Sequence, residues 1–293
     1  MDYLAYLFVR FAYSLYDHVP AEKAYGIGAG FAKLVYPLFA SRRSLAVGNI
    51  LKAGITADRE EAERIAKAAF GHFAGHLCEA IKIGDALSGS DWKDHFVYDG
   101  LPEVWETLSA KTDRPVLIVS GHHGVWESAV PLISSFRPMI AVARKMNNPY
   151  VNDLMKKRHF RGNITVISKD KGFTPGVIRQ WKQTNAAMTL LADQHAGRRH
   201  GLKVDFFGHP AGTHTSPARL YEATRAPMLV GSFVREAAFK YRMVAVGNVY
   251  EPELSGNNID DRTRILGELN SRLAEVIRRY PEQYLWAHRR WRG

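Results

Sequence analysis

The order of elements from about residue 95 onward predicts an α/β fold with a central, mostly parallel or mixed β-sheet covered by helices. Short apolar stretches there alternate with stretches whose apolar residues recur at helical spacing. Strands that alternate with helices in this way are typical of a parallel sheet. Two apolar segments precede this part. We therefore expect membrane-associated helices over residues 1–40 and one α/β domain over residues 41–293.

The first two apolar segments cover residues 3–16 and 24–40. Each is interrupted, by Arg10 in the first and by Lys33 and Pro37 in the second. Neither reaches the roughly 18 to 20 apolar residues that span a bilayer. Aromatic residues crowd the first segment, which favours helices at a membrane interface over the alternative, a pair of buried core helices. These aromatic residues are Tyr3, Tyr6, Phe8, Phe11, Tyr13 and Tyr16.

A long helix is predicted after residue 58, where Asp58 and Glu61 resemble a capping box. His72 and His76 lie four residues apart on it, and we expect them on its polar face rather than at a metal. The single cysteine, Cys78, excludes an intramolecular disulfide and is expected to be structural. The apolar face of this helix is formed by Ala62, Ile65, Ala66, Ala69, Phe70, Phe73, Leu77 and Ile81.

Beyond this helix the chain predicts seven strands and six helices. The strands are expected at residues 96–98, 116–120, 139–144, 164–168, 187–192, 228–234 and 241–249. The helices are expected at residues 101–109, 125–132, 149–160, 175–182, 216–223 and 260–279. Residues 204–215 form an expected glycine-rich turn.

The chain has 40 Lys and Arg against 29 Asp and Glu, a formal net charge of +11. This excess suggests an anionic partner, such as an anionic membrane surface, an acidic carrier or nucleic acid. The alternative is a surface whose charge serves solubility. The basic residues are dispersed and no nucleic-acid-binding motif occurs, which disfavours a non-catalytic nucleic-acid or membrane binder.

The most informative stretch is residues 116–127, in which a buried strand is followed by Gly121, two histidines and Glu127. Sites in open α/β sheets lie at the carboxyl ends of strands. A neutral His122 there could act as a general base, with Glu127 fixing its tautomer. The alternative is a histidine with a structural role. His123 is interpreted as a neighbour of the base.

Four further stretches follow this one in the chain, and the five together resemble a known family in sequence and order. The combination resembles the late acyltransferases of lipid A biosynthesis, the lauroyl/myristoyl transferases, within the lysophospholipid acyltransferase-like superfamily. The matching pieces are S-G-H-H-G-V-W-E (120–127), R-K-M-N-N-P-Y-V-N-D-L-M (144–155), A-D-Q (192–194), F-F-G-H-P-A-G-T-H-T (206–215) and Y-L-W-A-H-R-R-W (284–291).

The resemblance implies an O-acyltransferase in which His122 is the general base, Glu127 its partner and Asp193 a supporting carboxylate. The family's arginine falls in the helix before Gly162, where Arg158 is the first choice and Arg161 the second. Supporting or substrate-binding roles fall to Arg144, Thr213 and Thr215.

The same resemblance implies the substrates and the location. The donor is acyl carrier protein or acyl-CoA, the acceptor a hydroxyl of a lipid A precursor, and no cofactor or metal is needed. The protein is expected at the cytoplasmic face of the bacterial inner membrane, as a peripheral or monotopic protein or with a single N-terminal anchor. Its role would lie in lipopolysaccharide biosynthesis.

Two other enzymatic interpretations stay open. A related enzyme could acylate another glycolipid or a lysophospholipid, for example a phosphatidylinositol mannoside. A metal-dependent hydrolase could use His122, His123 and Glu127, although no H-E-x-x-H motif occurs. Its further ligands would come from His195, His209 and His214.

Overall fold

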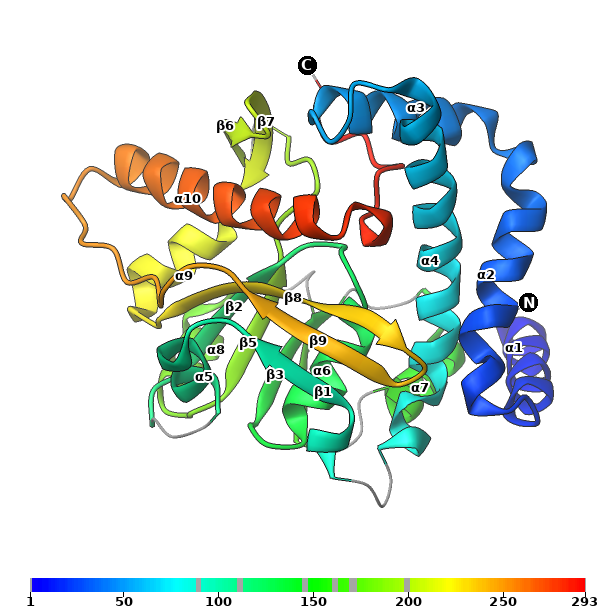
Figure 1. Ribbon diagram of the computed structural model, residues 1–293. Helices are drawn as coiled ribbons and strands as arrows, with labels where there is room; N and C mark the ends of the chain where they lie inside the picture. Colours follow the sequence, from blue (N-terminus) through cyan, green and yellow to red (C-terminus); the bar gives the residue numbers. More distant parts are fainter. Residues whose placement is uncertain are drawn as a thin grey trace.

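The computed structural model describes residues 2–87, 91–109, 113–143, 147–159, 163–168, 173–197 and 201–292. Its centre is a seven-stranded sheet of order β1-β9-β8-β2-β5-β3-β4 (Figure 1). The strands are β1 (Phe96–Asp99), β2 (Val116–Ser120), β3 (Met139–Ala143), β4 (Ile164–Ser168), β5 (Ala187–Leu191), β8 (Met228–Ala237) and β9 (Lys240–Ala245). All seven predicted strands are therefore present in one sheet.

The sheet is mostly parallel, as predicted. Five of its six strand pairs are parallel, and only β8 and β9 pair antiparallel. These two strands are joined by a tight turn in which Phe239 has a positive φ of 51°. The last strand ends at Ala245, shorter than the predicted 241–249, because Gly247 takes a φ of +72° that an extended strand does not allow.

Helices cover both faces of the sheet. All five residues of β2 are buried, and they alternate between two apolar clusters as the period of a strand requires. Leu117 and Val119 pack into the cluster that holds α8, α9 and α10, whereas Val116 and Ile118 pack against α5 and α6. These helices and α7 are α5 (Pro102–Leu108), α6 (Trp126–Ser134), α7 (Pro149–His159), α8 (Pro175–Lys182), α9 (Ser216–Thr224) and α10 (Asn258–Arg279).

Four helices precede the sheet: α1 (Asp2–Asp17), α2 (Ala24–Val35), α3 (Ala40–Lys52) and α4 (Arg59–Ala86). In Figure 1, α2 runs beside α4 at one edge of the molecule. Glycines allow this close packing, since a Cβ at Gly28 would lie 2.6 Å from the Ala74 carbonyl oxygen and one at Gly75 would lie 2.8 Å from the Tyr25 ring. The proposed boundary at residue 40 stays a prediction.

The N-terminus of α4 is capped by Asp58, whose Oδ1 accepts the amide of Glu60 at 2.9 Å. The predicted capping box is thus only half confirmed: the Glu61 carboxylate pairs with Arg64 at 2.7 Å instead.

The prediction that His72 and His76 lie on a polar face is wrong, because both side chains are buried. Along residues 71–83, where α4 packs between α2 and α6, every residue is buried or half-buried, so no solvent-facing side is left there. His72 is hydrogen-bonded to the Tyr25 hydroxyl at 3.1 Å and to the Gly124 carbonyl at 2.9 Å. His76 packs against the indole of Trp126, with ring centroids 3.9 Å apart.

The predicted turn at residues 204–215 is instead part of a two-stranded antiparallel hairpin, formed by β6 (Gly201–Phe206) and β7 (His209–His214). Its two-residue turn places both Phe207 (φ 58°) and Gly208 (φ 78°) in the left-handed region. Such turns match the twist of paired strands. A phenylalanine at the first turn position hid this signal, since asparagine, aspartate or glycine is usual there.

Within the described ranges, no helix combines the length and the apolar character needed to cross a bilayer.

Candidate active site

The site forms where two neighbouring strands end. Strands β2 and β5 are parallel and in register, with Ser120 opposite Leu191. His122 and Asp193 each follow two residues later, so their side chains meet at the carboxyl edge of the sheet. Gly121 allows this approach, because a Cβ there would crowd the Asp193 side chain at 3.2 Å.

His122 is held by two hydrogen bonds to one carboxylate. Its Nδ1 lies 2.8 Å from Asp193 Oδ1, and its backbone amide donates to Oδ2 at 2.9 Å. An ionised carboxylate only accepts, so Nδ1 carries a proton and Nε2 of the neutral ring is left as the basic nitrogen. The His122 side chain is 20% exposed and that of Asp193 only 2%, so the base faces solvent while its partner stays buried.

Gln194 reaches the basic nitrogen. Its Nε2 lies 3.2 Å from His122 Nε2. With Nδ1 protonated, the Gln194 amide donates to the lone pair of Nε2. A substrate hydroxyl must replace this amide before it can give up its proton to His122.

The surroundings keep Asp193 ionised. Burial alone would raise the pKa of its carboxyl, but the charge of His122 and the hydrogen bonds that His122 donates outweigh burial and hold this pKa below its usual value. Tyr284 is also buried beside Asp193; burial and the carboxylate charge raise the pKa of its phenol far above the usual value. Tyr284 therefore stays neutral beside Asp193.

Glu127, the predicted orienting partner of His122, lies in the first turn of α6. Asp193, not Glu127, occupies the Nδ1 position, so the orienting role passes to Asp193. Glu127 touches solvent but is crowded by protein atoms, and this desolvation raises the pKa of its carboxyl, while Trp126 and His122 act in the opposite direction. Because Glu127 interacts electrostatically with His122, Glu127 remains a predicted residue of the site.

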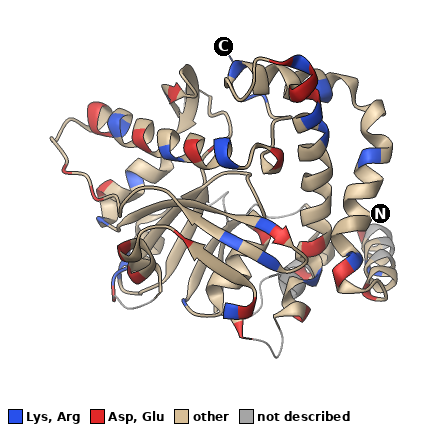
Figure 2. Ribbon diagram, viewed as in Figure 1, with Lys and Arg blue, Asp and Glu red and all other residues tan. Residues whose placement is uncertain are grey.

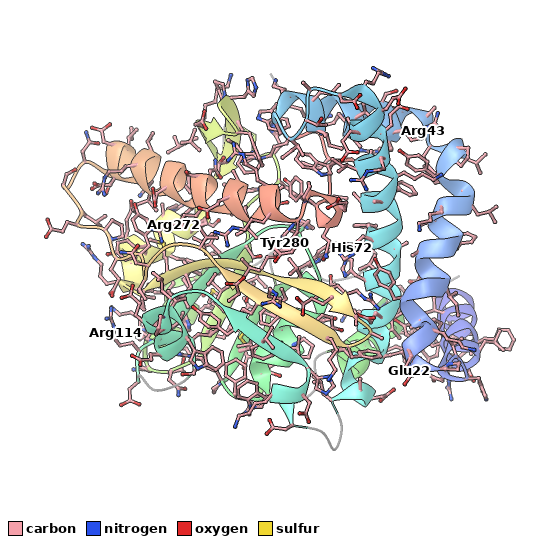
Figure 3. The ribbon with its side chains drawn as sticks, in the orientation of Figure 1. Glu22, Arg43, His72, Arg114, Arg272 and Tyr280 are labelled. Carbon is pink, nitrogen blue, oxygen red and sulfur yellow. The ribbon has the colours of Figure 1, made fainter. Side chains whose placement is uncertain are left out.

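His123 points away from the groove at the strand ends. Its Nδ1 bonds to the Ser232 hydroxyl at 3.0 Å, and its Nε2 bonds to the Tyr280 carbonyl at 3.0 Å. Burial lowers the pKa of His123 to about 4. This residue is thus a neutral link between β2, β8 and the end of α10, where Figure 3 labels Tyr280.

The predicted arginines cannot be placed in the site. Arg144 and Arg161 lie outside the described residues, and Arg158 belongs to α7 by its backbone while its side chain lies outside them. Thr213 is buried in β7 and accepts hydrogen bonds from Arg290 at 2.7 Å and Asn270 at 3.2 Å. Thr215 precedes α9 as its N-cap residue. Thr213 thus anchors the C-terminal tail.

The tail, residues 281–291, contains one of the family motifs, but none of its residues is among the predicted site residues. The Leu285 amide donates to the His122 carbonyl at 3.0 Å, and His288 Nε2 accepts the His195 amide at 3.0 Å. Asn49 of α3 donates to the carbonyls of Trp286 and His288 at 2.7 and 2.8 Å. The tail therefore joins α3 to the backbone of both loops that carry the site.

His122 opens onto a groove of about 590 Å³ at the strand ends, which we call the strand-end groove. Apolar side chains make up much of its wall, and the imidazole and the Gln194 amide supply polar groups. Ser168, Thr189, His214 and Ser216 add further polar groups to the wall. A groove with an apolar wall and several polar groups suits an amphipathic, lipid-like ligand. Its lining includes His122, Gln194, Val142, Ile167, Phe173 and Leu191.

No metal site is evident in the part of the chain that the structure describes: no three His, Cys, Asp or Glu residues converge there. His209, proposed as a ligand in the hydrolase alternative, bonds to the Lys52 carbonyl at 2.9 Å.

Comparison with known proteins agrees with this geometry. A family described as "Bacterial lipid A biosynthesis acyltransferase" matches residues 1–293. The chain is 27% identical over 182 residues to a protein named "Lipid A biosynthesis palmitoleoyltransferase" from Escherichia coli (strain K12). It is equally similar to a "Lipid A biosynthesis acyltransferase" from Shigella flexneri. Each alignment covers 61% of this chain and 56% of the relative, so the chain spans about half the length of the curated relatives it matches.

Proposed function

The chain belongs to the bacterial lipid A biosynthesis acyltransferase family, and we propose that it transfers a fatty acyl group from a thioester to a hydroxyl of a lipid A precursor. The observation that carries this proposal is the His122–Asp193 pair at the edge of an apolar groove. A partly exposed imidazole with a buried, ionised partner is suited to removing a proton from a hydroxyl.

In the proposed reaction, His122 Nε2 takes the proton of the acceptor hydroxyl as its oxygen attacks the thioester carbonyl. A new C–O ester bond forms and the C–S bond breaks. His122 then returns the proton to the leaving thiolate. Asp193 stabilises the imidazolium between these steps, as the carboxylate of a catalytic triad does.

Two groups near Nε2 complete the proposed mechanism. The displaced Gln194 amide remains close enough to donate to the oxyanion that forms on the carbonyl. The Glu127 carboxylate adds negative potential that favours the imidazolium. Arg144, Arg158 and Arg161 stay predicted contacts for phosphate groups of the acceptor. The reaction needs no cofactor besides the thioester co-substrate, acyl carrier protein or acyl-CoA.

The N-terminal helices would hold the enzyme at the cytoplasmic face of the bacterial inner membrane as a peripheral or monotopic protein. Large apolar residues at i, i+4 and i+7 of α2 are exposed, and the stripe continues at i+11 into the 3-10 turn that follows this helix. Lys33 is the one charged residue of α2 (Figure 2). A similar stripe with a spacing of four runs along α1. An exposed apolar stripe along a helix is suited to the interface of a bilayer. The stripes consist of Ile27, Phe31, Leu34 and Leu38, and of Tyr3, Leu7, Phe11 and Leu15.

The test is an incubation of the purified protein with acyl carrier protein and coenzyme A thioesters of several chain lengths and with several acceptors, analysed by mass spectrometry. The acceptors are a lipid A precursor, a phosphatidylinositol mannoside and a lysophospholipid. An acylated lipid A precursor supports the proposal, and product on another acceptor alone would favour the related glycolipid enzyme. Release of free fatty acid that requires added zinc, with no acylated lipid, would favour the hydrolase.

A further inference from the structure

A second groove of about 360 Å³ lies on the helical side of the molecule, between the α2–α3 junction, α4 and the C-terminal tail. We call it the helical groove. Aromatic side chains from all three parts line it: Phe39 from the junction, Phe70 and Phe73 from α4, and Trp286 from the tail. Such a wall takes an apolar chain or ring rather than a polar metabolite.

Two arginines line the same groove. Arg42 is exposed and Arg43 half-buried at the start of α3, where Figure 3 labels Arg43. One Arg42 donor is fixed on the Ala287 carbonyl at 3.0 Å, and the Arg43 guanidinium lies 5.5 Å from the centre of the Tyr36 ring. Within the described ranges neither arginine forms an ion pair, in contrast to Arg59 and Arg64 on the adjoining α4. Both guanidinium groups therefore have donors available for an anion.

The inner end of the helical groove adjoins the catalytic histidine. Leu285, which lines the groove, donates its amide to the His122 carbonyl. Phe73 contacts Trp126 with ring centroids 5.8 Å apart, and Trp126 in turn lies 5.3 Å from the His122 ring. The outer end reaches Phe39, next to the exposed Leu38 of the apolar stripe. The groove thus runs from the proposed membrane face to Phe73 and Leu285, and the Trp126 ring lies between Phe73 and the His122 ring.

We propose that the helical groove binds the phosphate-bearing lipid acceptor, with Arg42 and Arg43 on a phosphate and the aromatic wall on an adjoining acyl chain. This inference rests on the proposed function. A two-substrate transfer must bring two lipid-like molecules to one imidazole, and the strand-end groove accounts for only one of them. The strand-end groove then holds the acyl thioester, and the helical groove, open toward the membrane face, admits the acceptor.

Anionic lipid is favoured over an acidic carrier protein as the partner of these arginines. A carrier protein meets basic residues on an open surface, whereas here the two cations border an apolar cavity. Guanidinium groups bind phosphate with two parallel hydrogen bonds, and a lysine or amide does not reproduce this geometry.

The binding experiment uses the full chain with His122→Ala, which prevents turnover. The probes are dioctanoyl phosphatidic acid, dioctanoylglycerol and inorganic phosphate, each added to neutral detergent micelles. Hydrogen exchange measured by mass spectrometry is followed in peptides that cover residues 36–43 and 284–288. We expect protection of both peptides by phosphatidic acid, with much less by either of the other probes.

Replacing the arginines should weaken this binding. In the R42Q/R43Q variant we expect the half-saturating phosphatidic acid concentration to rise at least tenfold, since a hydrogen bond to a charged group contributes about 1.5–3 kcal/mol. Arg179→Gln is the control, because Arg179 is an exposed arginine on α8 that lines neither groove. Protection by phosphatidic acid that is unchanged in R42Q/R43Q would overturn the proposal.

Kinetics with otherwise wild-type protein separate this inference from the proposed function. R42Q/R43Q should raise the KM for the lipid acceptor about tenfold and leave the KM for the acyl donor unchanged. A raised donor KM with an unchanged acceptor KM would assign the arginines to the carrier protein and refute the inference. If the wild-type protein showed no acyl transfer, the proposed function would be contradicted. The hydrogen-exchange data would still show whether the helical groove binds an anionic lipid.

Discussion

His122, Asp193 and Gln194 come together from two loops 71 residues apart, and each would set one property of the proposed base. In the proposed mechanism Asp193 fixes the tautomer of His122 and stabilises its imidazolium. The Gln194 amide is hydrogen-bonded to His122 Nε2, the nitrogen that would accept the proton of the substrate hydroxyl. The hydrogen bond from the His122 backbone amide to Asp193 is a second link between the two loops, and it holds the carboxylate in place beside Nδ1.

Asp193→Asn should lower kcat by about a thousandfold, within the range expected for loss of oriented general-base catalysis. An asparagine amide can donate to Nδ1, which favours the tautomer with the proton on Nε2 and removes the base. The KM of the acceptor should hardly change, since Asp193 is buried away from the groove. Steady-state acyl transfer measures both constants. Asp58→Asn is the control, because asparagine also caps a helix. A kcat close to wild type in Asp193→Asn would refute the orienting role.

At the scale of elements, α4 illustrates how tertiary packing decides what a helix face does. Its apolar spacing and start were predictable from the sequence. The burial of His72 and His76 was not predictable, because it depends on α2 lying beside α4 and on the edge-to-face contact of Trp126 with His76. Gly28 and Gly75 make this contact possible, yet glycines in helical patterns do not reveal which helix they meet.

The α2 stripe carries a prediction at this scale. Phe31→Ser with Leu34→Ser should weaken binding to vesicles with anionic lipid by roughly tenfold or more, since each large apolar side chain transferred from water contributes about 1.5–3 kcal/mol when fully buried. Vesicle flotation measures the bound fraction. Val97→Ser is the matched control, because Val97 is equally apolar and about half exposed but lies on β1. Flotation unchanged by the double substitution would exclude α2 from the membrane contact.

At the scale of the whole molecule, buried neutral histidines join the helical part to the sheet. His72 links α4 to the loop after β2, and His123 links that loop to β8 and α10. Burial lowers the pKa of each to about 4. Between pH 6.5 and 4 the unfolded chain therefore takes up protons that the folded chain does not.

The free energy of unfolding should consequently fall as the pH is lowered through this window. Each of the two histidines contributes a slope of at most about 1.4 kcal/mol per pH unit. Urea unfolding at pH 7, 6 and 5 measures the slope. His123→Asn should make the slope shallower. His209→Asn, at a half-buried position on the β6–β7 hairpin, is the control for the loss of a histidine as such. Equal slopes for wild type and His123→Asn would show that this histidine does not drive the pH dependence.

The α/β class, the seven strands and the position of His122 at a strand end were predictable because strand period and strand boundaries are local properties of the chain. The partner of His122 was not predictable from spacing, because Glu127 is near in sequence while Asp193 is near only if β5 is the neighbour of β2. Strand order is a long-range property: β3 and β4 intervene in the chain but lie beyond β5 in the sheet. The role of the tail was hidden for the same reason, since Leu285 meets His122 across 163 residues of chain.

Acyl transfer by His122→Ala tests the central claim most directly. The rate of transfer from an acyl thioester to a lipid A precursor is measured in one turnover, with enzyme in excess, for wild type and variant. If His122 is the general base, the variant should keep its urea stability and vesicle binding but transfer at least a hundredfold more slowly. Transfer at the wild-type rate by a folded, membrane-bound His122→Ala protein would contradict the mechanism.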